Sequence, residues 1–127
     1  RNAEKKLYRI VFACDEIAEV LDKTGLSKQQ KDEILKIESE LSIIARQGRA
    51  FGIHLVLATQ RPDAAILNGQ IRNNIDTRIC GRADNVLSQI ILDNTDASDK
   101  IAKSSQGRFL TNSGKIFQAY WFDENIL

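Results

Sequence analysis

The segment LYRIVFACDE, residues 7–16, decides the fold class of this chain. Its first eight residues are rich in β-branched and aromatic side chains and are too few for a helix of their own, so they predict a strand in the middle of a sheet. Two adjacent acids, Asp15 and Glu16, follow at once and therefore fall at the C-terminal end of that strand. A pair of carboxylates at a strand tip is the first indication of a functional site.

Helical and extended patterns alternate after this strand. A long amphipathic helix is expected from Ser27, a suitable N-cap, to about residue 50, because apolar residues recur there at three- and four-residue spacing. The apolar run at 53–59 predicts a second buried strand. A third strand, a short helix and a hairpin are expected at 75–82, 85–92 and 107–122, respectively. This order predicts an α/β fold with a mostly parallel sheet and a C-terminal hairpin.

The composition fits one globular domain over residues 1–127. The 18 Lys and Arg residues against 17 Asp and Glu leave a net charge of +1, so any contact with DNA must be local. The apolar runs are shorter than the roughly 20 residues of a membrane span. Cys14 and Cys80 lie in apolar runs, as is typical of reduced thiols in a cytoplasmic protein. Because methionine is absent, even at residue 1, we expect a piece cut from a larger protein.

The acid pair has a chemical interpretation and a plainer one. In the first, one carboxylate holds Mg²⁺ through water and the other orients or deprotonates a nucleophilic water, as phosphoryl hydrolysis requires. An apolar run followed by Asp-Glu is the Walker B pattern. In the second, the acids form a solvated turn or the N-terminus of a helix. Thr59, Gln60 and Arg61 follow the second predicted strand and fall at the same edge, where open α/β sheets bind ligands.

A longer stretch carries a family resemblance. Residues 45–97 resemble the FtsK/SpoIIIE family of P-loop motor ATPases in the order and spacing of GIHLVLATQRP, IRNNIDTRI and ILDNTDA. DEIAEV stands in the Walker B place, GRF continues the likeness near residue 107, and the resemblance covers about residues 8–111. It is strongest to the motor domains of conjugative transposons and plasmids, the coupling-protein branch. It implies part of a RecA-like three-layer P-loop NTPase core, the C-terminal half that follows Walker A.

The resemblance also implies an activity and partners. The parent protein would be an ATPase that uses ATP and Mg²⁺ to move DNA, without reading its sequence, in DNA transfer or conjugation. It would form a homo-oligomeric ring, a hexamer, and work with transfer-channel proteins. The motor would be cytoplasmic, with the parent associated with the cytoplasmic side of the membrane. Two alternatives stay open: the motor ATPase of a specialised protein-secretion system, and a degenerate, non-catalytic assembly module.

Single residues receive roles from the same resemblance. Asp15 would hold the hydration shell of Mg²⁺, Glu16 would be the catalytic base, and Gln60 would sense the γ-phosphate. Arg49, in QGRAFGIH, matches the arginine that coupling proteins point into the neighbouring subunit's nucleotide site. Alternatives stay open here too: Gln60 as an ordinary strand-end residue, Arg49 as a helix cap, and Arg46 as the finger in its place.

Several arginines near the third predicted strand are candidates for contact with DNA phosphates. They are Arg61, Arg72, Arg78 and Arg82. The alternative is that they brace nearby acids, such as Asp76 and Asp84, at a subunit interface. Acids alternate with these arginines along the chain, which favours bracing over a continuous basic track.

The chain departs from the family pattern in one decisive respect. None of its seven glycines forms G-x-x-x-x-G-K-[ST], the loop whose backbone amides and lysine hold the phosphates. The chain by itself is therefore predicted to be inactive as an ATPase. We expect the loop in an N-terminal part of the parent, since Walker A precedes Walker B in the family; a degenerate copy is the alternative.

Overall fold

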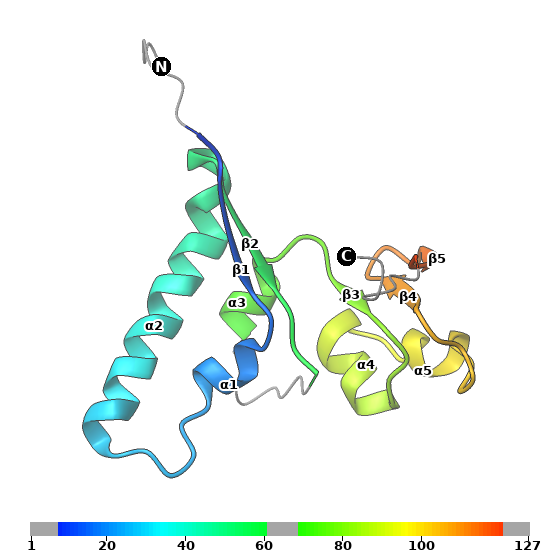
Figure 1. The fold of residues 1–127 in the computed structure, drawn as a ribbon, viewed down its shortest axis with the longest axis horizontal. Coiled ribbons are helices and arrows are strands. Elements are labelled where there is room, and N and C mark those ends of the chain that lie inside the picture. Colours follow the sequence, from blue (N-terminus) through cyan, green and yellow to red (C-terminus); the bar gives the residue numbers. More distant parts are fainter. Residues whose placement is uncertain (1–7, 61–68, 121–127) are drawn as a thin grey trace, which may run out of the picture. The chain divides into compact units, whose positions relative to one another are not determined.

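A computed structural model describes residues 8–60 and 69–120 (Figure 1). The chain forms two compact units, residues 1–75 and residues 76–127, here named the N-terminal and C-terminal units. The N-terminal unit holds a two-stranded parallel sheet, and the C-terminal unit holds a three-stranded antiparallel sheet. The interpretation of residues 1–127 as one domain of a larger motor stays a prediction. In the described ranges, no helix is both long and apolar enough to cross a membrane.

The sheet of the N-terminal unit consists of β1 (Ile10–Cys14) and β2 (Ile53–Leu57), paired in parallel along their whole length. Both strands were predicted, with slightly wider bounds. α2 forms most of the connection between them and runs beside them (Figure 1). The helices described in this unit are α1 (Ile17–Leu21), α2 (Lys28–Gln47), the 3-10 helix η1 (Gly48–Phe51) and α3 (Gly69–Asn73).

The long helix α2 begins and ends for identifiable reasons. Ser27 caps its start, as predicted: the Ser27 hydroxyl accepts from the Gln30 backbone N–H at 3.4 Å, and the Gln30 side chain accepts from the Ser27 N–H at 3.0 Å. At the other end, a Cβ on Gly48 would lie 3.1 Å from Ile44 Cγ2 and would crowd the start of β2. Glycine therefore suits the close approach of this helix to the strand.

One face of the parallel sheet is partly covered and the other is exposed. Leu55 and Leu57 pack against the core of the unit. The opposite face carries Val11 and Val56, which are 64% and 54% exposed. Parallel strands are normally covered on both faces, and the apolar sequences of β1 and β2 are typical of such strands. In the described residues, however, no second layer covers the face of Val11 and Val56. The buried core consists of Ile17, Leu21, Leu41 and Ile71.

The C-terminal unit is built on an antiparallel sheet in the order β3-β4-β5. The strands are β3 (Ile79–Cys80), β4 (Arg108–Thr111) and β5 (Ile116–Gln118), and β4 with β5 forms the predicted hairpin. The helix α4 (Asn85–Leu92) coincides with the predicted short helix, and α5 (Asp96–Lys100) follows it. The α/β class, with a parallel sheet and a C-terminal hairpin, is thus confirmed.

The third predicted strand, residues 75–82, is shorter than expected and pairs antiparallel with β4 instead of extending the parallel sheet. Asn112 gives the physical reason. Its Nδ2 donates to the Asp76 carbonyl oxygen at 3.0 Å, and its Oδ1 accepts from the Arg78 N–H at 3.1 Å. A side chain of the hairpin therefore takes backbone bonds that a longer strand would have given to a neighbouring strand.

Apolar side chains from α4, α5 and the antiparallel sheet form the second core. Its buried members are Cys80, Leu92, Ala97, Ile101 and Leu110. Burial raises the pKa of the Cys80 thiol, because desolvation disfavours the thiolate. Both cysteines are free thiols, as predicted.

Candidate functional site

The carboxyl ends of β1 and β2 lie side by side. Beyond the strands, the Ala58 N–H donates to the Cys14 carbonyl oxygen at 2.8 Å, and the Ile17 N–H donates to the Ala58 carbonyl oxygen at 2.9 Å. These bonds continue the parallel pairing into the loops. The structure therefore brings the acid pair at 15–16 next to residues 59–60 at one edge of the sheet.

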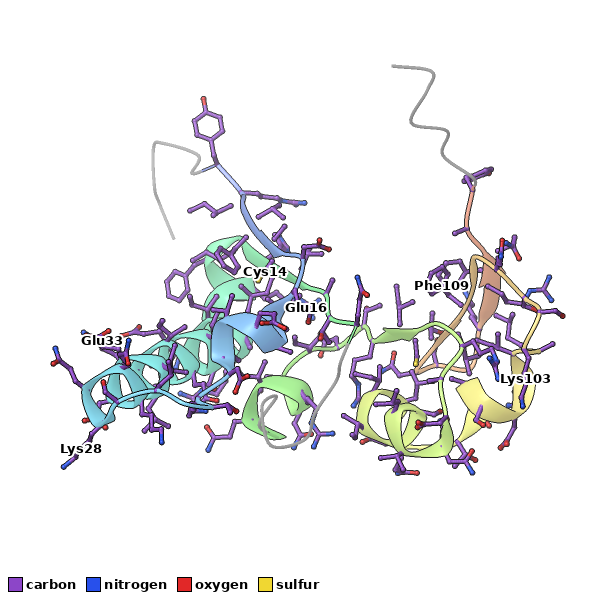
Figure 2. The ribbon with its side chains drawn as sticks, turned by 60° about the horizontal axis from the view of Figure 1, so that its bottom comes forward. Cys14, Glu16, Lys28, Glu33, Lys103 and Phe109 are labelled. Carbon is purple, nitrogen blue, oxygen red and sulfur yellow. The ribbon has the colours of Figure 1, made fainter. Side chains whose placement is uncertain are left out.

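The carboxylate of Glu16 is bound by the segment that follows β2. The Thr59 hydroxyl donates to Oε1, and the backbone N–H of Gln60 donates to Oε2 at 2.8 Å. Glu16 stands at the start of α1 as its N-cap residue, but its side chain makes no capping bond to that helix (Figure 2). Glu16 is therefore at a helix terminus, as the plainer interpretation expects, but its side chain bonds the segment after β2 instead of capping the helix.

This geometry suits proton transfer. The Thr59 hydroxyl and the Gln60 N–H orient the carboxylate, and an ionised carboxylate can accept a proton from water. Glu16 is half-buried, so a ligand can reach it, and Asp15 is exposed at the tip of β1. The Gln60 side chain is exposed at the same edge.

The donor set fits magnesium that is held mainly by water and phosphate. In residues 8–60 and 69–120, no group of three or more His, Cys, Asp or Glu side chains could hold a metal ion by itself. Mg²⁺ commonly takes one or two carboxylates together with waters and substrate phosphates, and Asp15 offers one such carboxylate. The edge thus fits the hydrolytic half of a nucleotide site, whereas the sequence lacks the phosphate-binding loop.

Arg49 lies at the other end of β2. It belongs to η1, which directly precedes the strand, whereas Glu16 binds residues that follow the strand. The five residues of β2 separate these ends by about 16 Å, at about 3.3 Å per residue. The structure therefore does not bring Arg49 to Glu16 within one chain.

Arg49 shares its surface with Arg46 and Phe51. Both arginines are exposed, and Phe51 is 69% exposed. An open depression of about 640 Å³ is lined by Arg46, Gln47, Arg49, Ala50 and Phe51. Arginine and aromatic residues are enriched where proteins contact other proteins, so this surface has the composition of a contact site.

The arginines predicted to contact DNA have different surroundings. Arg78 Nη2 forms an ion pair with Asp93 Oδ2 at 2.7 Å, and its Nε and Nη1 atoms are buried. This ion pair is a bracing contact for Arg78 inside the C-terminal unit. Arg72 is half-buried on α3, and Arg82 is exposed between β3 and α4. Arg61 lies outside the described residues.

Thr59 is the residue whose contact sequence reasoning missed. The sequence places it at the ligand edge but assigns it no role. The available signal was its position, because a hydroxyl directly after the strand beside the Asp-Glu strand can reach across to the second acid. The hydrogen bond to Glu16 became apparent only from the structure.

Comparison with known proteins identifies relatives along nearly the whole chain. No protein-family model matches the chain. DNA translocase FtsK of Haemophilus influenzae is 33% identical over 98% of this chain, which spans 23% of that protein. The solved pCW3 conjugation coupling protein TcpA, in its monomer form with ATPγS, is 42% identical with a TM-score of 0.87, over 97% of this chain and 35% of that one.

A secretion ATPase shares the fold. The cytoplasmic domain of EccC, the type VII secretion ATPase of Thermomonospora curvata, is 23% identical with a TM-score of 0.68, over 94% of this chain and 13% of that one. At this identity the likeness shows the fold alone. The likenesses to FtsK and TcpA, in contrast, combine sequence identity with nearly complete coverage of the chain. The chain therefore belongs to the FtsK/SpoIIIE family and carries part of its P-loop ATPase fold.

Proposed function

We propose that this chain is the C-terminal part of a motor that uses ATP to drive DNA during DNA transfer or conjugation. The observation that carries the proposal is the Glu16 carboxylate, bound at the carboxyl edge of the parallel sheet by the Thr59 hydroxyl and the Gln60 N–H. A carboxylate held in this way is suited to deprotonate water. The names of the relatives, a DNA translocase and a conjugation coupling protein, support the choice of cargo.

Each hydrolytic role falls to a group at this edge. Bound ATP with Mg²⁺ supplies the phosphoryl group that water attacks. Asp15 holds a water of the Mg²⁺ hydration shell at the tip of β1. Glu16 accepts the proton of the attacking water, and its two donors keep the carboxylate oriented. The Gln60 side chain detects the γ-phosphate.

Arg49 acts on the nucleotide of a neighbouring copy. Its place at the end of β2 opposite Glu16 argues against a role in the site of its own chain. A carboxylate edge at one end of the sheet and exposed arginines at the other favour head-to-tail contacts, which close into a ring; we propose six copies. Arginine fingers of this kind contribute about 10³ or more in rate. Arg46, one turn earlier on α2, is the alternative finger.

The remaining parts come from the parent protein. It supplies the phosphate-binding loop, so the 127-residue chain alone is expected to be inactive. DNA is bound without sequence preference, through its phosphates. Transfer-channel proteins are further partners, and the parent works at the cytoplasmic side of the membrane.

The first test is the steady-state ATPase rate of the full-length parent, with and without duplex DNA, beside its Glu16→Gln variant. DNA is expected to raise the rate, and Glu16→Gln is expected to bind ATP but not turn it over. Glu19→Gln is the matched control, because Glu19 is an exposed acid on the adjoining helix α1. Normal turnover in Glu16→Gln would contradict the proposal. An ATPase rate that DNA does not change would favour a protein-secretion motor. No ATP turnover under either condition would favour a degenerate module.

A mixing experiment tests the role of Arg49. Glu16→Gln and Arg49→Ala subunits of the parent are each expected to be inactive alone. Mixed rings should regain part of the rate, because a subunit with intact Glu16 then receives Arg49 from its neighbour. No recovery on mixing would show that Arg49 acts within its own chain or caps η1. The same mixture with Arg46→Ala decides between the two arginines.

A further inference from the structure

We propose that Thr59 is a positioning residue for the catalytic base. Its hydroxyl and the Gln60 backbone N–H form a two-point clamp on the Glu16 carboxylate, and the hydroxyl fixes the orientation in which Glu16 meets the attacking water. This inference rests on the proposed function and adds to it a residue that never touches the nucleotide.

The two bonds of the clamp reach different oxygens of one carboxylate. Oε1 accepts from Thr59 and Oε2 accepts from Gln60, so a rotation of the carboxylate about its last bond breaks at least one of them. Without the hydroxyl, Oε1 loses this donor while Oε2 keeps its bond to the Gln60 N–H. The hydroxyl therefore helps to fix the orientation of the carboxylate.

Backbone hydrogen bonds fix the segment that carries Thr59 and Gln60. Ala58, directly before Thr59, is bonded through its N–H to Cys14 and through its carbonyl oxygen to the N–H of Ile17. These bonds tie both flanks of the acid pair to the segment that carries the donors. Thr59 is half-buried, and its β-branched side chain has few rotamers, so its hydroxyl has few alternative positions.

The chemistry separates Thr59 from the groups that bind ATP. A threonine hydroxyl has one hydrogen, and here it is directed to Glu16. Loss of this hydroxyl should therefore slow the chemical step and leave the binding of ATP intact. In kinetic terms, kcat should fall while KM and the ATP dissociation constant stay the same.

The test compares three variants of the full-length parent. Thr59→Val keeps the shape but removes the donor, and kcat is expected to fall by roughly 10²-fold, the size of effect that follows small misplacements of reacting groups. Thr59→Ser keeps the donor and should restore most of kcat. Thr95→Val is the matched control, because it removes a comparable hydroxyl–carboxylate bond, Thr95 Oγ1 to Asp99 Oδ2 at 2.7 Å, in the C-terminal unit.

A second readout does not depend on turnover. The Gln60 amide is expected to exchange its hydrogen faster in Thr59→Val than in the wild type or Thr59→Ser, because the carboxylate that accepts it is held less firmly. Equal exchange and equal kcat in Thr59→Val and the wild type would overturn the clamp. A higher kcat in Thr59→Val would also overturn the clamp, since the hydroxyl would then slow proton transfer to Glu16 instead of supporting it.

The failure of the clamp and the failure of the proposed function can be told apart. If Glu16→Gln is inactive and Thr59→Val is as active as the wild type, the clamp is wrong and the function stands. If Thr59→Val and Thr59→Ser lose kcat equally, the role is packing and the clamp is wrong. If Glu16→Gln turns over normally, both the proposed function and the catalytic role of the clamp are overturned.

Discussion

The N-terminal unit leaves one face of its sheet exposed, whereas the C-terminal unit secures its strands and helices with its own polar side chains. Val11 and Val56 on the parallel sheet are 64% and 54% exposed. In the C-terminal unit, Asn112 bonds the backbone of residues 76 and 78, and Ser88 bonds the backbone of Asn94 and Ala97. The acid pair thus belongs to the unit whose sheet has one face exposed in the described residues. Parallel sheets are generally covered on both faces, so we expect a further layer on this face in the parent.

The largest expected effects come from the two cores. Leu21 in the N-terminal unit and Leu110 in the C-terminal unit are each 0% exposed. Each Leu→Ala substitution should cost about 2 to 5 kcal/mol of the free energy of unfolding. In the 127-residue chain, amide hydrogen exchange followed in each unit should show the loss only in the unit that carries the substitution. An equal loss in both units would show that they unfold as one cooperative body.

The next effect distinguishes two buried serines. Ser88 Oγ donates to the Asn94 carbonyl oxygen at 2.7 Å and accepts from the Ala97 N–H at 3.1 Å, so Ser88→Ala should cost about 1 to 3 kcal/mol. Ser42 Oγ bonds only the Glu38 carbonyl oxygen inside α2 among the described contacts, and alanine favours helix there. Ser42→Ala should therefore be nearly neutral in urea unfolding. Equal losses of stability in the two variants would contradict this distinction between a hydrogen bond within one helix, as at Ser42, and hydrogen bonds that join separate segments, as at Ser88.

The pH dependence of stability gives a smaller contrast. Burial raises the pKa of Cys80 from its ordinary value of 9.0. A raised pKa in the folded state means that this contribution to stability is complete below pH 9.0 and is lost as the pH rises through the folded pKa. One proton limits the slope to about 1.4 kcal/mol per pH unit. Urea unfolding above pH 9.0 should show a fall in stability within this limit in the wild type and not in Cys80→Ala. The same fall in both would remove Cys80 as its source.

The smallest effect tests the exposed face. Val11→Lys in the 127-residue chain should change the free energy of unfolding by less than about 0.5 kcal/mol, because the side chain faces solvent. Leu55→Lys, on the covered face, is the comparison and should be strongly destabilising. In the full-length parent, Val11→Lys should also become destabilising if another layer covers this face. A neutral result in the parent would show that the face stays open there.

The sequence predicted the elements that depend on long apolar patterns. The strands near 10–14 and 53–57, the Ser27 cap and the helix at 85–92 all followed from periodicity and capping chemistry. The short helices α1, α3 and α5 were missed, because five residues give too little periodicity to detect. The length of the third strand was overestimated. The hydrogen bonds that Asn112 makes to residues 76 and 78 cannot be inferred from the apolar pattern of residues 75–82.

The candidate site was predictable only in part. The place of Asp15, Glu16 and Gln60 at one edge followed from strand order, since the carboxyl ends of parallel strands meet there. The donors to Glu16 were not predictable, because side-chain direction across two strands depends on register. Arg49 was singled out by resemblance, and the structure puts it at the opposite end of β2.

The identity of the second donor to Glu16 has a genetic consequence. The N–H that binds Oε2 belongs to the backbone of Gln60, so nearly every substitution at position 60 removes the side chain and keeps this bond. Under the proposed function, such alleles would separate nucleotide sensing by Gln60 from proton abstraction by Glu16: the parent would still hydrolyse ATP but would no longer couple it to movement. Proline alone lacks the N–H, so Gln60→Pro would impair both functions at once.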